Sequence, residues 1–583
     1  MNREAGSSNR HPLARRSWAL GLALATLAVL TGDLVFEWLD HRPGGRSFRF
    51  GAQPVLMGLF AVATIATLRW RRLGGALASF CTGGLIVFAT EQLVAAHAAV
   101  VIVGFALPTV WWFLADIAQR SAPARSQDTP TQSTRRSVVG RRWLLVRSFA
   151  IASVAALGGG WAGRSIHQAI FGPTHPGSAT DLAAAEAVQW AWAGGLTQRS
   201  AEVVAKVTGP AGALRVVGPD GSQRLVPPVR TIGDIAQFAV DGLRPDTTYR
   251  YAVADADTVD TARAGRFTTF PEGAGSFTLA FASCARTGSN GAVFDRIREA
   301  GPLLYTNLGD FHYGDVADDD SGEFAALMDI TLSRPAQSAL YRSTGVEYVW
   351  DDHDFGGLDR DSRGRPAAFA TYRSHVPSRP LPHPDVGLFR SFDIGRIRMI
   401  ITDCRAARTP AGHPDGPAKS MLGPLQRDWL IEELSSVGDA PLVIWVNPVP
   451  WIADVDEGAD HWGGYATERA AISEAIARLA ISDRLLMVSG DAHMVGLDDG
   501  TNSDYSSAGG AGFPVFHVAA LDKTGEVKGG PYSHGAFPGG GQFGLVEILD
   551  DGPHLAVSLQ GRSWDGRAIV DYQLELAGRT VTR

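Results

Sequence analysis

The most constraining feature of this sequence is the uneven division of its charge between two parts. Residues 1–164 contain 18 Arg, no Lys and seven acidic residues, which gives a net charge of +11. The remaining 419 residues contain 35 basic and 53 acidic residues, which gives −18. One domain is therefore not expected, and a length of 583 residues allows about three or four.

Five apolar runs in the basic part predict a helical membrane block in residues 1–164. Several runs are shorter than the about 20 residues needed to cross about 30 Å of hydrocarbon, so the number of spans stays open at about five. Arg is concentrated in alternate connections, which is typical of the cytoplasmic side. We therefore expect a multi-pass protein of the cell membrane, in contact with bilayer lipid, whose catalytic part is extracytoplasmic. The runs are Ser17–Gly32, Pro54–Leu68, Leu73–Thr90, Ala95–Ala115 and Ser148–Ala162.

Two other interpretations of these runs stay open. One or more of them could be a buried helix of a domain that does not enter a membrane. The pair Arg135–Arg136, followed by an apolar stretch to Ala162, also resembles a twin-arginine export signal placed internally. Either the membrane block or this signal would export the rest of the chain.

The acidic charge of the larger part argues against binding to nucleic acid, which requires a basic surface. The three cysteines, Cys81, Cys284 and Cys404, are too few for a disulfide framework, and their spacing matches no zinc ribbon. No feature indicates an obligate protein partner. Nucleic-acid binding is therefore set aside as a function.

Residues 165–271 predict a linker followed by a small β-domain. Gly and Pro residues in 165–182 indicate the linker. In 183–271 short stretches of alternating apolar and polar residues are separated by turn residues, which is the pattern of an antiparallel sandwich. The stretch Asp241–Tyr249 resembles the loop and strand entry of fibronectin type III-like modules. The expected strands are Val188–Trp192, Glu202–Val207, Leu214–Val217, Ala236–Val240, Tyr249–Val253 and Arg266–Phe270.

The pattern changes in residues 272–583, where buried strands alternate with helices. This alternation predicts an α/β core whose strand ends carry the chemistry. Helices are expected at Ala292–Glu299, Pro424–Leu434 and Thr467–Ala480, and a closing antiparallel sheet near the end of the chain. The expected core strands are Phe277–Ala282, Leu303–Asn307, Glu347–Trp350, Ile397–Thr402, Leu442–Val446 and Leu485–Val488.

Polar clusters that could bind metal follow four of these strands. Carboxylate, imidazole, phenolate and thiolate groups that meet at one edge of a sheet would hold divalent or trivalent cations. Two cations about 3.5–4 Å apart need a bridging carboxylate, and Asp310 is the best candidate because the preceding glycine permits a sharp turn. The clusters end in Cys284, Asp310 to Tyr313, Asp351 to Asp354, and Asp491 to His493.

The order and context of these clusters resemble the PhoD-like (alkaline phosphatase D) branch of the calcineurin-like metallophosphatase superfamily. The likeness extends from about Val188 to Leu574 and leaves the amino-terminal block outside. The motifs that carry it are Ala-Ser-Cys284, Gly-Asp310-x-x-Tyr313, Trp350-Asp-Asp-His353, Asp403-x-Arg405-x-x-Arg408, Leu422-Gly-x-x-Gln426-x-x-Trp429, Asp460-x-Trp462-x-Gly-Tyr465-x-x-Glu-Arg469 and Ser489-Gly-Asp491-x-His493.

The resemblance implies a fold and a set of metals. The fold is a four-layer α/β/β/α phosphoesterase domain, and the metals are Fe³⁺ with Ca²⁺ or another divalent cation. Carried over by position, Cys284, Asp310 and Tyr313 become iron ligands, and Asp491 and His493 become metal ligands.

Two further positions follow from the same resemblance. Asp352 falls where the superfamily has a metal-binding Asn, and His353 corresponds to the histidine that serves the leaving group. One position departs from the family, because Leu358 stands where relatives usually have Asn. A calcium ligand is therefore in doubt unless Asp359 replaces it.

The chemistry expected of these groups is hydrolysis of a phosphate ester. Metal ions would lower the pKa of bound water so that hydroxide attacks phosphorus in line. Protonated His353 would give its proton to the departing alkoxide. Arg405 and Arg408 are candidates for a phosphate clamp, with pairing to a structural carboxylate as the alternative. Asn447, at the end of a core strand, could also face the metals.

We therefore predict a membrane-anchored, outward-facing metal-dependent phosphoesterase acting on phosphomonoesters, phosphodiesters or both. Two alternatives belong to other classes. One is a non-catalytic binding or scaffold protein of the cell surface that uses the sandwich module. The other is a membrane sensor or transporter with a regulatory phosphatase-like domain.

Overall fold

The computed structural model describes residues 168–576, apart from 169, 174–187, 210–211, 255–259, 261, 317–318, 358–364, 524, 526 and 575. Nearly all described residues belong to one unit, Ile170–Arg583. The predicted membrane block and most of the predicted linker lie outside them, as do Leu358 and Asp359.

Three of the six predicted core strands belong to a large mixed sheet of ten strands, and the mixed α/β class is confirmed. Strands β9, β10 and β11 pair in parallel, so their carboxyl ends meet at one edge. Hairpin-connected strands from the end of the chain extend the sheet beyond β9. The order is β21 (Ala568–Leu574), β20 (Leu555–Ser563), β19 (Gln542–Asp550), β9 (Phe277–Ala282), β10 (Leu304–Asn307), β11 (Gly345–Tyr348), β1 (Val188–Gly194), β2 (Ala201–Val207), β6 (Ile235–Val240) and β5 (Arg230–Ile232).

A second sheet of seven strands is also parallel at its centre, where β13, β14, β15 and β17 pair side by side. All residues of β14 and β15 are buried, which explains their continuous apolar sequences. The order is β12 (Arg390–Ile394), β13 (Ile397–Ile401), β14 (Leu442–Asn447), β15 (Leu485–Ser489), β17 (Val515–Val518), β16 (Met494–Asp498) and β18 (Ala536–Pro538).

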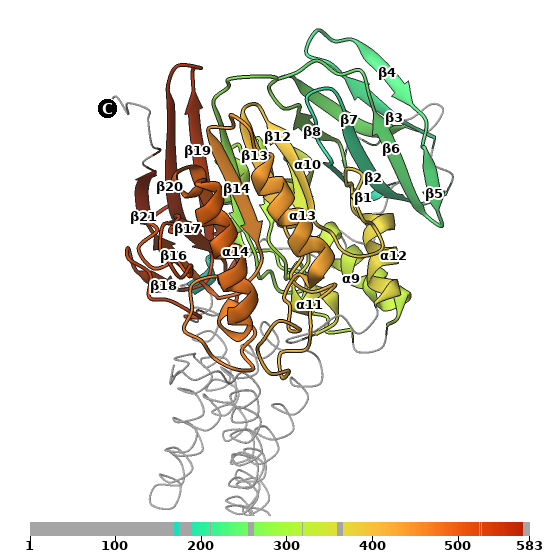
Figure 1. The fold of residues 1–583 in the computed structure, drawn as a ribbon. Coiled ribbons are helices and arrows are strands. Elements are labelled where there is room, and N and C mark those ends of the chain that lie inside the picture. The colour runs from blue at the N-terminus through green and yellow to red at the C-terminus, as the bar shows by residue number, and fades with distance from the viewer. Residues whose placement is uncertain are drawn as a thin grey trace, which may run out of the picture. The chain divides into compact units, whose positions relative to one another are not determined.

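The two large sheets share one hydrophobic core, and helices cover the other face of the seven-stranded sheet (Figure 1). Alternation along β14 produces this layering, since successive side chains point to opposite faces. Ile444 joins the core that contains Phe281 of β9. Trp445 joins a second core with Leu430 and Ile476, which lie on the covering helices α13 (Gly423–Ser435) and α14 (Ala466–Leu479).

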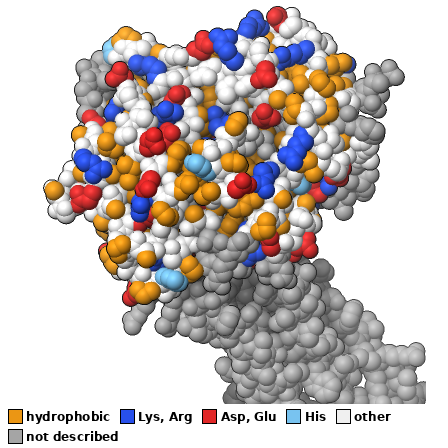
Figure 2. All heavy atoms as spheres, turned by 45° about the vertical axis from the view of Figure 1, so that its right-hand side comes forward, with side chains coloured by type: hydrophobic (Ala, Val, Ile, Leu, Met, Phe, Trp, Pro, Cys, Tyr) orange, Lys and Arg blue, Asp and Glu red, His pale blue; other side chains and the backbone are white. Residues whose placement is uncertain are grey.

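The remaining helices pack around the ten-stranded sheet, apart from the short helix α11, which follows β11. Proline at the first or second position of α10 and α12 fits their starts, because the first N–H groups of a helix have no partner within it. Acidic, basic and apolar side chains are interspersed on the face drawn in Figure 2. These helices are α8 (Ala292–Glu299), α9 (Ser321–Ser333), α10 (Pro335–Ser343), α11 (Asp352–Phe355) and α12 (Pro366–His375), with 3₁₀ turns at Trp462–Tyr465 and Ser482–Arg484.

The predicted sandwich strands form, but they are not separate from the α/β core. Three of them join β4, which was not predicted, in a small sheet in the order β4 (Gln223–Val226), β3 (Ala213–Val217), β7 (Thr248–Ala254) and β8 (Gly265–Thr268). The other three, β1, β2 and β6, continue the ten-stranded sheet together with β5, which was not predicted, because Ala193 and Gly194 of β1 pair with β11 in parallel. The sequence pattern marked the strands but not this long-range pairing.

The predicted location in the cell membrane needs correction. No helix among the described residues is long and apolar enough to cross a membrane. The longest of them, α14, has 14 residues, and at 1.5 Å per residue this gives only about 21 Å of the about 30 Å required. The apolar runs on which the prediction rested lie outside the described residues.

Candidate metal centre

The predicted site residues follow strands from both large sheets. Cys284 comes after β9, Asp310 after β10, and Asp491 after β15. Asp352 begins α11, directly beyond the end of β11. Because these strands are parallel within each sheet and the sheets share a core, their carboxyl ends meet in one place.

Three of these residues have left-handed backbone conformations. The φ angles are 64° at Cys284, 53° at Asp310 and 72° at Asp491. Side chains with a Cβ atom adopt this region at a cost of about 1–3 kcal/mol each, and such residues cluster at functional sites. Gly309 has a φ of 102°, and a Cβ atom there would overlap Asp351. The backbone is thus bent to bring these side chains together.

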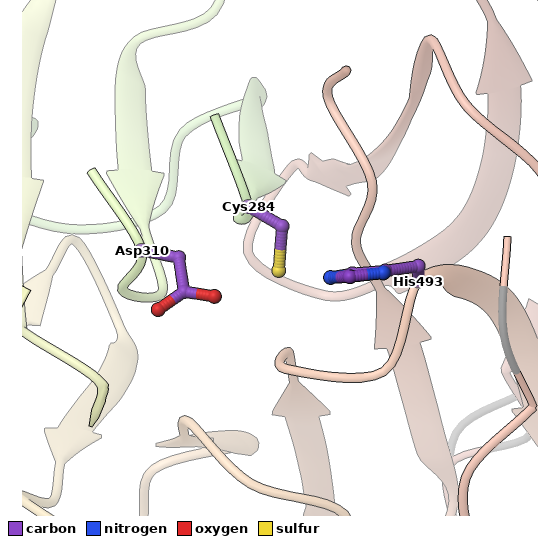
Figure 3. A group of neighbouring side chains, drawn as sticks. All are labelled: Cys284, Asp310 and His493. Carbon is purple, nitrogen blue, oxygen red and sulfur yellow. The ribbon is translucent and has the colours of Figure 1, made fainter. Parts of the chain in front are cut away.

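Cys284, Asp310 and His493 form the first group that could hold a metal ion. Each offers one ligand atom, and these atoms lie within 4.8 Å of one another. Figure 3 shows their side chains converging from separate segments of the chain. The Tyr313 hydroxyl donates to Asp310 Oδ2 at 2.5 Å and lies 3.2 Å from His493 Nε2. Tyr313 therefore borders the same group, as expected.

Two more groups are linked to the first through shared carboxylates, Asp310 between the first and second groups and Asp352 between the second and third. One consists of Asp310, Asp352 and His353, and the other of Asp351, Asp352 and Asp491; each also fits within 4.8 Å. Asp310 and Asp352 each belong to two groups. The structure thus brings together all six residues predicted as metal ligands, and His353 beside them.

The donors present fit bound metal ions. Asp310 Oδ1 and Asp351 Oδ2 are buried and have no hydrogen-bond partner within the described part of the chain. Burial first, and then the nearby carboxylate of Asp352, raise the pKa of Asp310 well above its usual range. Burial and then Asp310 likewise raise the pKa of the Cys284 thiol. Buried like charges with unused oxygen atoms are stabilised by cations.

His353 lies at the border of these groups. Its Nδ1 is 2.5 Å from Asp315 Oδ1, and its ring centroid is 4.0 Å from that of Tyr313. Asp315 has a left-handed φ of 51°. The Asp315 carboxylate fixes which ring nitrogen of His353 is engaged, and leaves Nε2 for other chemistry.

The two predicted clamp arginines face carboxylates of the protein. Arg405 is fully buried; its two terminal nitrogens donate to Asp460 at 2.9 and 3.0 Å, and its Nε donates to Asp351. Arg408 Nη1 lies 2.5 Å from Asp460, and Nε donates to the Tyr465 hydroxyl. This geometry corresponds to the alternative of structural pairing. A clamp role for Arg405 stays a prediction that these contacts do not favour.

Other strand-end residues hold the site in place. Asp354 accepts hydrogen bonds from the backbone nitrogens of Phe311 and Asp351, which fixes the loops after β10 and β11. Asn447 Oδ1 accepts from Cys404 Sγ and from the Trp462 indole, and its Nδ2 donates to the Val449 carbonyl. Asn447 is thus saturated by protein groups.

Sequence reasoning missed two lysines at this site. Lys528 Nζ lies 3.0 and 3.1 Å from the two carboxylate oxygens of Asp491. Lys523 Nζ lies 3.7 Å from the centroid of the Tyr313 ring. A signal existed, because the chain has only four lysines and these two are five positions apart.

Carboxylate, thiol, phenol and imidazole groups gathered at the strand ends of a two-sheet α/β fold are the donor set expected of a metal-dependent hydrolase. Comparison with known proteins narrows this class. Residues 330–528 match the model of the PhoD-like phosphatase family. This part of the chain belongs to that family, and the protein is a phosphate ester hydrolase, which confirms both predictions.

Comparison of structures agrees at the level of the fold. A solved structure described as "Structure of PhoD" matches with a TM-score of 0.50 and 15% identity, over 67% of this chain and 93% of that one. The sensor domain of the anti-sigma factor RsgI4 from Pseudobacteroides cellulosolvens matches 15% of this chain and 99% of its own, at 15% identity and a TM-score of 0.13, which is too low to support inference. No curated protein matches the chain.

Proposed function

We propose that this protein hydrolyses phosphomonoesters, phosphodiesters or both at the cluster formed by Cys284, Asp310, Asp352, Asp491 and His493. Tyr313 completes the proposed ligand set. The observation that supports this most strongly is that three overlapping donor groups lie together, and that each contains a residue with a left-handed backbone conformation.

We propose Fe³⁺ with Ca²⁺, or another divalent cation, as the metals. A thiolate sulfur and a phenolate oxygen suit a transition metal as ligands. A site built only from carboxylates suits a hard cation such as Ca²⁺. The Cys284, Asp310 and His493 group has the first character, and the Asp351, Asp352 and Asp491 group has the second. When bound, such ions would make water more acidic and neutralise charge on the phosphoryl oxygens.

His353 is proposed as the proton donor. In the hydrolysis, water adds to phosphorus as the phosphorus–oxygen bond of the ester breaks, and the departing alkoxide needs a proton. Asp315 engages Nδ1 of His353, so the proton would leave from Nε2. Arg405 is proposed as a positioning residue that holds Asp351 through the ion pairs described above.

We also propose the finer architecture as predicted: a fibronectin III-like module in 183–271 and a four-layer phosphatase domain in 272–583. The two-sheet core with α13 and α14 on one outer face supports the four layers. The small sheet β4-β3-β7-β8, opposite β1, β2, β5 and β6, supports the module.

The test is elemental analysis of the purified full chain, together with hydrolysis of p-nitrophenyl phosphate and bis(p-nitrophenyl) phosphate before and after chelation. We expect bound iron, and a visible phenolate-to-iron band that disappears in Tyr313→Phe. Tyr251→Phe is the matched control, because the Tyr251 hydroxyl is buried and has no hydrogen-bond partner among the described residues. Undiminished hydrolysis after complete metal removal would overturn the proposal.

A further inference from the structure

Lysine is rare in this protein, and half of its lysines lie at the candidate metal centre. The four are Lys206, Lys419, Lys523 and Lys528. Lys523 and Lys528 belong to one segment that follows β17. Because most other cationic positions carry arginine, two lysines at one site are unusual for this chain.

The backbone of this segment is joined to the site. Leu521 N donates to the carbonyl of Ser283 at 3.1 Å, and Asp522 N donates to the carbonyl of Cys284 at 3.4 Å. Asp522 Oδ1 accepts from the backbone nitrogen of Arg286 at 2.6 Å. These three hydrogen bonds therefore position Lys523 beside Cys284.

The two ammonium groups lie next to different donor groups. Lys523 lies over the ring of Tyr313, next to the group that contains Cys284 and Asp310. Lys528 contacts Asp491, which belongs to the group of Asp351 and Asp352. The side chain of Lys528 is 18% exposed, so it reaches solvent at the edge of the site.

Two arginines near the site, Arg405 and Arg408, are enclosed by contrast. The side chains of Arg405 and Arg408 are 0% exposed, and both bind Asp460. They cannot reach a substrate without breaking buried ion pairs, which is costly. An ammonium group is a compact charge on a flexible stem and can follow a phosphate oxygen.

We propose that Lys523 and Lys528 form a two-ammonium subsite that binds the terminal oxygens of the substrate phosphoryl group and favours phosphomonoesters over phosphodiesters. This rests on the proposed hydrolase function and deepens it. Above pH of about 6 a monoester presents three terminal oxygens and a charge near −2. A diester presents two terminal oxygens and a charge of −1, so each ammonium group gains more from the monoester.

A purely structural role for the lysines makes a different prediction. Lysines that only balance the carboxylates would, when removed, reduce metal content and thermal stability. Both esters would then be hydrolysed more slowly by the same factor. The ratio of monoester to diester hydrolysis therefore distinguishes lysines that bind the substrate from lysines that only balance the charge of the carboxylates.

The experiment uses the full chain with Lys523→Met and Lys528→Met, and measures kcat/KM for p-nitrophenyl phosphate and bis(p-nitrophenyl) phosphate. We expect a loss of about 10- to 100-fold for the monoester and less than about threefold for the diester, the range expected for one charge-assisted hydrogen bond. Calorimetry with inorganic phosphate should show a Kd raised by about tenfold or more. Lys523→Arg and Lys528→Arg should restore part of the monoester preference.

Lys206→Met is the matched control. Lys206 lies on β2 and pairs with Asp329 at 2.6 Å and Asp234 at 3.2 Å, so its removal should leave the ratio of the two activities unchanged. Equal losses for both esters, or unchanged phosphate binding, in both methionine variants would overturn the subsite. If a methionine variant fails to fold, an arginine variant whose monoester-to-diester ratio falls below the parent's, with a raised phosphate Kd, supports the subsite, and one that loses both activities by the same factor with an unchanged phosphate Kd overturns it. A parent protein that hydrolyses neither ester would instead refute the proposed function itself.

Discussion

Asp310 and Asp403 are both buried aspartates that follow a strand, one in each large sheet, yet their surroundings are opposite. Asp310 accepts one hydrogen bond, from Tyr313, and its other oxygen has no partner among the residues described. Asp403 accepts four hydrogen bonds of 2.8–2.9 Å. Its donors are the backbone nitrogens of Leu388, Arg405 and Ala406 and the indole nitrogen of Trp350.

A ligand-binding carboxylate and a structural one can therefore be distinguished by their hydrogen-bond donors. Position at a strand end is common to both and brings both near the same edge. What differs is the number of protein donors, because a saturated carboxylate has no lone pair left for a cation. In the ten-stranded sheet the strand ends leave oxygens unused, whereas β13 and β14 of the other sheet end in saturated groups, Asp403 and Asn447.

The largest effect is expected for Asp310→Asn. Loss of a carboxylate shared by two donor groups should reduce kcat/KM for a phosphate ester at least about 1000-fold, since metal-based charge stabilisation is worth several kcal/mol. Metal content should fall as well. Thermal stability of the chelated protein should stay the same or increase, because one of several crowded buried charges is removed.

Asp403→Asn is the matched variant in the other sheet. Its new amide N–H₂ would face N–H donors, so we expect destabilisation of about 1–3 kcal/mol in chemical denaturation. Metal bound per folded molecule should not change. If Asp403→Asn loses metal while it keeps its stability, the count of hydrogen-bond donors is not what distinguishes the two aspartates.

Arg405→Met tests the arginine that pairs with the buried carboxylates. The variant leaves Asp351 without its buried arginine and Asp460 with Arg408 in place of two arginines, and we expect a loss of about 3 kcal/mol in the free energy of unfolding. Activity should fall together with stability. Unchanged stability with a raised KM for the phosphate ester would instead support the predicted phosphate clamp.

Two histidines extend the same comparison to pH. His493 faces the metal groups, whereas His517 on β17 is saturated, with Nδ1 2.9 Å from Ser489 Oγ and Nε2 2.9 Å from the Ala492 carbonyl. Burial lowers the pKa of His517 to about 4 from its ordinary value of 6.5. The unfolded chain therefore binds more protons between these values, and stability is lost as pH falls through 6.5 toward 4.

For His517 this loss amounts to about 2 kcal/mol between pH 6.5 and pH 5. His517→Gln removes the titrating group, so the variant should lose about that much less than the parent when denaturation is measured at both pH values. Equal losses for parent and variant would show that His517 is not held neutral by its surroundings.

The sequence predicted much of this fold and site because strand-end polar residues are a local signal. Apolar runs gave the core strands, and the six residues proposed as ligands lie close together, whereas their metal binding stays a prediction. Two things could not be read. The pairing of β1 with β11 joins segments about 150 residues apart, and the commitment of Arg405 to Asp460 depends on where a distant loop returns.

The smallest effect on activity is expected for substitutions of the two buried cysteines. Cys284 follows β9 with a left-handed φ of 64° and lies within the first donor group. Cys404 follows β13, and its Sγ donates to Asn447 Oδ1 at 3.1 Å. Cys284→Ser replaces a soft donor by a weaker oxygen donor, so we expect metal affinity and activity to fall about tenfold.

Cys404→Ser should change activity less than about twofold, because a hydroxyl can make the same hydrogen bond to Asn447. Metal titration followed by spectroscopy, with activity measured at saturating metal, distinguishes weaker binding from a poorer catalyst. Since both cysteines are buried and each follows a strand, burial and position are matched between the variants. A similar loss of metal affinity in both would mean that the backbone bend at Cys284 does not mark a ligand.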